Sequence, residues 1–82
     1  MANYLVTFHT HYGATRFHKY CKRENISVKM KPTPRELSSS CGVCVQMETS
    51  RVPSPAEHED MDSCYIIREN GVNNSFQRIH HY

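Results

Sequence analysis

The sequence lacks long apolar runs, has no tryptophan and has only three glycines. No apolar run approaches the ~18 residues that a membrane-spanning helix needs, so we expect no membrane partner. The N-terminal residues lack a basic region followed by a long apolar stretch, so we expect no signal peptide and a cytoplasmic protein. The chain also lacks an excess of one charge, with a net charge of +2. Nucleic-acid binders usually carry a dense basic stripe, so we expect no nucleic-acid partner.

Size and charge pattern limit the organisation of the chain. With 82 residues, it has room for one domain, which we expect to span residues 1–82. So small a domain buries only about 60% of the surface of its unfolded chain, and a homodimer that covers one face would be no surprise. One group of basic residues is interrupted by Glu24, and we interpret it as a solvated face: Lys19, Lys22, Arg23, Lys29 and Lys31.

The first half of the chain predicts a strand, a helix and a strand. Residues 4–8 are a short β-prone run. Residues 13–25 have an apolar stripe at helical spacing, with Thr10 as the N-cap. Residues 27–31 alternate apolar and basic side chains, as in a strand with one face in water. The stripe of the expected helix consists of Ala14, Phe17 and Cys21.

The second half predicts a strand, a second helix and a last strand. Residues 43–47 alternate again, and their valines favour a strand over the competing helix. Ser54, Pro55 and Glu57 form a capping box that predicts the start of a helix. Gly71 is its expected end, and residues 75–80 have the pattern of a strand. The buried face of this expected helix would carry Met61, Cys64, Tyr65 and Ile67.

This order of elements predicts an α+β fold. The sequence β-α-β followed by β-α-β is that of a ferredoxin-like plait, an antiparallel sheet with two helices on one face. The first and third strands lie centrally in such a sheet, so Val6 and Val45 are expected to be neighbours. The loop before the third strand should then open near the start of the first helix.

That loop carries the main candidate for chemistry, Cys41. Two prolines stop the preceding strand, and the loop runs over residues 32–42, which is long enough to indicate function. Ser40 precedes the thiol, Gly42 leaves space for a ligand, and Arg35 could stabilise a thiolate. His9 or His11 could act as its base, although solvated histidines are the simpler interpretation.

Cys41 and Cys44 also form a Cys-x-x-Cys motif, whose chemistry depends on the backbone. At a helix N-terminus the two sulfurs could approach each other, whereas residues three apart in a strand are about 10 Å apart, too far for a disulfide. Cys21 and Cys64 are expected to be small core residues. Structural zinc sites usually pair two such ligand couples, and the chain has only one. We therefore expect no metal and no cofactor.

Several segments together resemble a known family. Tyr-Leu-Val-Thr-Phe-His near the start, Lys-Tyr-Cys-Lys-Arg-Glu-Asn-Ile at the end of the expected helix, and Lys-Pro-Thr-Pro-Arg-Glu-Leu-Ser-Ser-Ser-Cys-Gly around Cys41 resemble the selenium/sulfur carrier protein-like family of small bacterial and archaeal proteins. The resemblance covers roughly residues 3–80. The sequence departs from the family pattern at Cys44, where the family more often has a small apolar residue.

The resemblance implies a carrier that holds sulfur or selenium on Cys41 as a persulfide or selenosulfide. Donor and acceptor proteins would be its partners, and Cys44 would be a second, resolving thiol in a dithiol version of the chemistry. Arg35, Ser40 and Gly42 would bind and stabilise the anion. Two alternatives remain: a non-catalytic interaction domain, and a thiol redox or metal-binding module that uses both cysteines. A carrier or binding protein is favoured over a stand-alone enzyme, because the sequence has no phosphate loop or metal signature.

Overall fold

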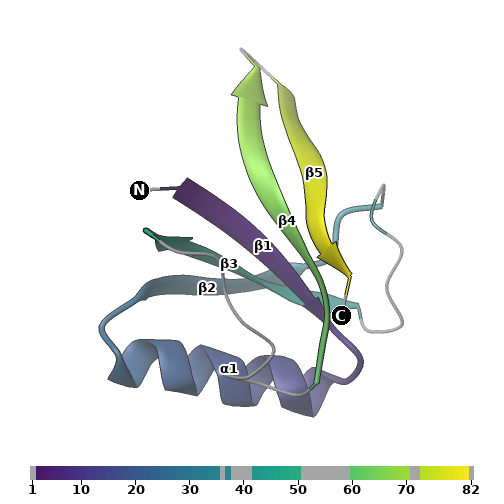
Figure 1. Ribbon diagram of the computed structural model, residues 1–82. Coiled ribbons are helices and arrows are strands. Elements are labelled where there is room, and N and C mark those ends of the chain that lie inside the picture. The colour runs from purple at the N-terminus through teal and green to yellow at the C-terminus, as the bar shows by residue number, and fades with distance from the viewer. Residues whose placement is uncertain (1, 36, 38–41, 51–59, 71–72, 82) are drawn as a thin grey trace.

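The computed structural model describes residues 2–35, 37, 42–50, 60–70 and 73–81. In these ranges the chain forms one five-stranded antiparallel sheet and one helix (Figure 1). The order of the strands across the sheet is β2-β3-β1-β4-β5. The elements are β1 (Ala2–Phe8), α1 (His11–Arg23), β2 (Ser27–Pro32), β3 (Val43–Thr49), β4 (Met61–Asn70) and β5 (Asn73–His81).

The predicted elements of the first half are confirmed. Thr10 is the N-cap of α1, and its Oγ1 accepts a hydrogen bond from Gly13 N at 3.0 Å. After the helix, Asn25 has a φ of 58°, the left-handed conformation that commonly ends a helix. Residues 43–47 lie in strand β3, and Val6 pairs with Val45 as expected.

The ferredoxin-like plait with two helices on one face is wrong. The expected second helix is replaced by β4, which pairs with β1 on one side and with β5 on the other. Figure 1 shows β4 and β5 as a long hairpin that rises away from α1. The start of the expected helix, Ser54 to Glu57, lies outside the described residues.

The physical reason is that the N-terminal part of β4 is buried on both of its faces. Cys64 packs with the residues beneath α1, whereas the next residue, Tyr65, packs on the opposite face of the sheet. A strand covered on both sides has apolar residues at odd and even positions. Such a run also places apolar residues three and four apart, which is the spacing that predicted a helix.

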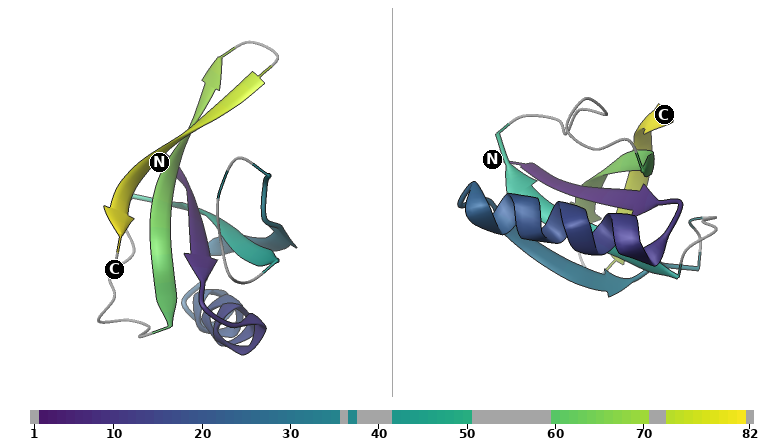
Figure 2. Two further views of the ribbon diagram at one scale, coloured as in Figure 1. Left: turned by 90° about the vertical axis from the view of Figure 1, so that its right-hand side faces the viewer. Right: turned by 90° about the horizontal axis from the view of Figure 1, so that it is seen from below.

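Helix α1 covers β1, β2 and β3 and encloses the main core (Figure 2). Its apolar stripe of Ala14, Phe17 and Cys21 is fully buried, as predicted. Phe17 packs on Phe8 of β1, with ring centroids 5.4 Å apart. The N-terminal turn of α1 is fixed to the start of β4, because Thr10 donates hydrogen bonds from N and Oγ1 to the Asp60 carboxylate. A Cβ on Gly13 would lie 1.8 Å from Asp60 Oδ2, so any larger residue there would displace the Asp60 side chain from Thr10.

Candidate functional site

The candidate site is the connection between β2 and β3. Pro32 pairs with Val43 at the end of the two strands, and Thr33 N donates a hydrogen bond to Gly42 O at 3.0 Å. The chain therefore leaves the sheet and returns to it at one narrow neck. Cys41 and Ser40 lie outside the described residues. The residues that flank them define the surroundings of the site.

The connection is anchored by Leu37. Its backbone N donates to Pro34 O at 3.0 Å, which forms a tight turn with Arg35 at an exposed corner. The Leu37 side chain is only 9% exposed and packs on the face of the sheet opposite α1. Its neighbours in that small second core are Leu5, Cys44 and Tyr65, with Ile67 and Phe76 at the edge. Among the described residues of the connection, Leu37 is therefore the apolar side chain that holds it to the sheet.

Cys44 lies beneath this anchor. It is the second residue of β3, is fully buried, and donates its S–H to Pro32 O at 3.7 Å. A thiol in this position has no access to solvent, and a buried cysteine behaves as a small apolar residue. Cys21 and Cys64 are also buried, in the core beneath α1, as predicted.

Gly42 has an open environment. A Cβ built on it meets no atom within 4 Å among the described residues, and Gly42 itself is exposed. Neither crowding nor a left-handed φ explains the glycine, which is consistent with space for an approaching ligand.

The neck has a second cation that the sequence reasoning did not select. Lys31 lies opposite Cys44 in the strand register, and its Nζ donates to Gln46 Oε1 at 2.7 Å. The alternation of apolar and basic residues at 27–31 could have identified Lys31, because this alternation places Lys29 and Lys31 on the face of the sheet opposite α1. Leu37 was missed as well, and its signal is a lone apolar residue in a polar segment.

The two histidines near the end of β1 lie at the same end of the sheet. Thr7, close to the end of β1, pairs with Cys44 near the start of β3. His9 and His11 follow β1 and are exposed, and His9 N donates to Asp60 O at 3.0 Å. Within the described part of the chain, no three His, Cys, Asp or Glu side chains are placed to hold a metal ion. The described helix is too short and too polar to cross a membrane.

The sheet and the one helix of the described residues define a small α+β protein, and the connection between β2 and β3, which contains Cys41, is its candidate sulfur site. Residues 3–58 match the family described as "Putative Se/S carrier protein-like", and the chain belongs to that family. The match contains β1 from its second residue, α1, β2, β3 and the whole connection between β2 and β3. It ends before β4, whereas the resemblance was expected to reach residue 80. Comparisons with curated proteins and with solved structures found no match.

Removal of the Leu37 anchor should expose Cys44. Leu37→Ala deletes the apolar cover, and a loss of about 2 kcal/mol, the lower end for a buried leucine, would raise the population of the locally open state ~30-fold. We expect a similar rise in the rate at which iodoacetamide alkylates Cys44, measured by peptide mass spectrometry in a Cys41→Ser background. Cys21 and Cys64, under α1, are internal controls. Leu37 is not a local anchor if the variant raises the alkylation rates of all three thiols equally. The same conclusion follows if the alkylation rate of Cys44 does not rise.

Proposed function

We propose that this protein carries a sulfur or selenium atom on Cys41 and passes it to an acceptor protein. The proposal depends on one observation, the family match over residues 3–58, which contains Cys41 and the residues around it. The neck at Thr33 and Gly42 supports it, because a segment held at its base can present a thiol without disturbing the sheet. The exposed Arg35 and the open Gly42 support it as well.

Loading is a thiol exchange that needs no external oxidant. The Cys41 thiolate attacks the outer sulfur of a donor persulfide, and the bond between that sulfur and the donor cysteine breaks. The donor leaves as a thiolate, and the chain holds a Cys41 persulfide. Arg35, Lys31 and the Ser40 hydroxyl are the proposed partners of this anion, since cations and hydrogen-bond donors stabilise sulfur anions. Selenium would follow the same route as a selenosulfide.

Delivery is the step in which Cys44 matters. In the one-cysteine route, an acceptor nucleophile attacks the outer sulfur, and Cys41 leaves as a thiolate. In the dithiol route, Cys44 attacks the Cys41 sulfur, sulfide leaves, and an external thiol must later reduce the resulting disulfide. The complete burial of Cys44 beneath Leu37 favours the one-cysteine route, because the dithiol route first requires that cover to open.

The test is incubation of the protein with a cysteine desulfurase and cysteine, followed by intact mass measurement under non-reducing conditions. We expect a gain equal to one sulfur atom, which cyanide removes as thiocyanate and which peptide mapping places on residue 41. Absence of any gain from the desulfurase and from inorganic polysulfide would exclude the carrier function. A gain on another cysteine would exclude the role of Cys41.

A further inference from the structure

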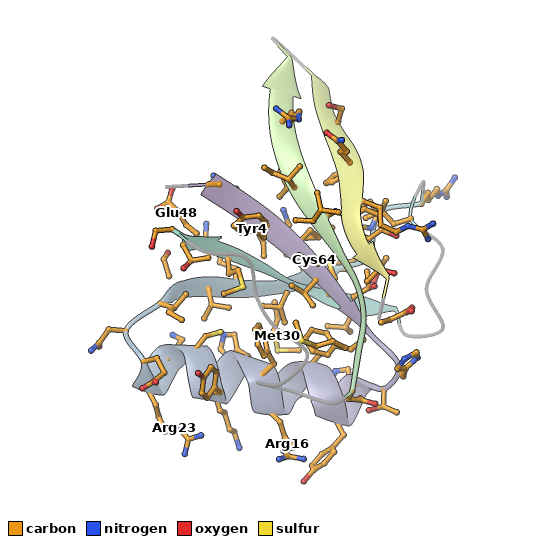
Figure 3. The ribbon with its side chains drawn as sticks, in the orientation of Figure 1. Tyr4, Arg16, Arg23, Met30, Glu48 and Cys64 are labelled. Atoms are coloured by element: carbon orange, nitrogen blue, oxygen red, sulfur yellow. The ribbon has the colours of Figure 1, made fainter. Side chains whose placement is uncertain are left out.

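The outward face of α1 carries an unusual concentration of positive charge. None of its 13 residues is acidic. Four basic side chains are exposed along it, namely Arg16, Lys19, Lys22 and Arg23, and Figure 3 shows Arg16 and Arg23 pointing away from the sheet. None of the four makes an ion pair with a described residue. Arg16 Cζ instead lies over the ring of Tyr12, 5.6 Å from its centre. We call these four residues the basic face.

The basic face is hollowed as well as charged. Among the described residues, the four basic residues and His18 line a shallow, open depression of about 660 Å³. Arginine and lysine bury their aliphatic stems along such a surface and keep their charged ends in water. The depression therefore combines apolar walls with a rim of cations, a combination that suits an acidic segment with some apolar side chains.

The stability of the helix does not explain this charge. Cations stabilise the last turn of a helix through its dipole, which accounts for Lys22 and Arg23. It does not account for Arg16 and Lys19, which lie earlier. Cations spaced three or four residues apart repel each other, as Lys19 does with Arg16 and with Arg23. Carboxylates from a partner would remove that repulsion.

We propose that the basic face docks an acidic segment of a protein that exchanges the chalcogen with Cys41. The proposal rests on the proposed carrier function and adds the surface that its protein partner recognises. Helix α1 starts at the end of the sheet where β3 starts, because Thr7 pairs with Cys44. A segment lying along the roughly 20 Å of a 13-residue helix would thus reach the end of the sheet at which the Cys41 connection meets β3.

The observations favour a protein over a nucleic acid. The net charge of the chain is only +2, whereas nucleic-acid binders depend on many phosphate contacts. The other lysines near α1 in sequence do not extend the basic face, because Lys29 and Lys31 alternate with Val28 and Met30, which pack toward the helix. The cations of the basic face are therefore confined to one helix, where their aliphatic stems form the walls of the depression.

Two double variants test the docking surface. Lys19→Gln/Arg23→Gln neutralises the basic face and keeps good helix formers, whereas Lys29→Gln/Arg78→Gln removes the same charge from exposed positions on two strands. The probe is a fluorescent polyglutamate peptide, followed by anisotropy at low salt and at about 0.15 M salt. We expect the helix variant to bind about fivefold to tenfold more weakly than the native protein, and the strand variant to stay within twofold of it.

Two outcomes would contradict the inference. If both variants bound the peptide equally more weakly, the binding would depend on net charge alone and not on the basic face. Tighter binding of an oligouridylate of matched charge, lost in the helix variant, would assign the surface to nucleic acid. Loading from inorganic polysulfide, which needs no docking, is measured in the same variants and should be unchanged. The carrier function can therefore fail or stand independently of the docking surface.

Discussion

The Cys41→Ser variant is expected to gain no sulfur from a cysteine desulfurase, whereas Cys44→Ala gains one sulfur atom as the native protein does. A serine hydroxyl is not ionised at neutral pH and cannot form a sulfur–sulfur bond, so its loss of loading should be complete. Cys44 should be dispensable because it is buried under Leu37 with its S–H directed to Pro32 O. Intact mass spectrometry of the three proteins, purified and treated in parallel, measures the difference.

Alanine is the better replacement at position 44. Cys44 sits in an apolar cluster with Leu5, Leu37 and Tyr65, where a serine hydroxyl would be costly to bury without a strong partner. Every variant retains Cys21 and Cys64, so background reaction of buried thiols is controlled within each molecule. Full loading of Cys41→Ser would end the assignment. Normal loading but lost delivery in Cys44→Ala would instead favour the dithiol route.

The first half of the fold was predictable because several local signals agree there. Thr10 offers a cap, and Ala14, Phe17 and Cys21 repeat at helical spacing, so capping and periodicity indicate the same helix. The strand at residues 27–31 has one face in water and one face toward α1, so its alternation is clear. When neighbouring signals agree in this way, local sequence determines the element.

In the second half the strands at residues 43–47 and 75–80 were predicted correctly, but the helix between them was wrong because two local signals conflicted. The capping box at Ser54 and Glu57 favoured a helix, and the apolar spacing after it was compatible with one. A glycine between two β-prone runs is, however, also a hairpin signal, and Gly71 was interpreted as a helix end. In the structure Asn70 pairs with Asn73. The long β4 is stabilised by pairing with β1, a contact distant in sequence that no local pattern contains.

The sequence identified the segment that carries the candidate site, but it did not identify the residues that hold this segment on the sheet. The segment around Cys41 identified the connection between β2 and β3, and the family match includes it. The sequence could not show that Leu37 folds back over Cys44, because that contact brings together residues from four separate segments. The sequence alone therefore left Cys44 open as a second, resolving thiol beside Cys41, whereas the structure places Cys44 in the interior.

The attachment of α1 to the sheet leads to the prediction with the largest effect on stability. Phe17 is fully buried against Phe8, with Tyr20 one turn away at 6.1 Å between ring centres. Phe17→Ala removes this ring and leaves a cavity, which typically costs about 3–5 kcal/mol. Domains are usually stable by only about 5–15 kcal/mol, so we expect a marginally folded protein with a much lower urea midpoint in circular dichroism.

Tyr12→Ala is the matched control, because it also removes an aromatic ring from α1 but at a side chain that is 70% exposed. Surface changes usually alter the free energy of unfolding by less than about 0.5 kcal/mol, and alanine is the better helix former. A large loss for Phe17→Ala beside a small change for Tyr12→Ala would show that the inner face of α1 closes the core. Equal small changes would mean that the sheet is stable without the helix. The basic face could then not be a rigid docking surface, since α1 keeps a fixed position on the sheet only while Phe17 packs against β1.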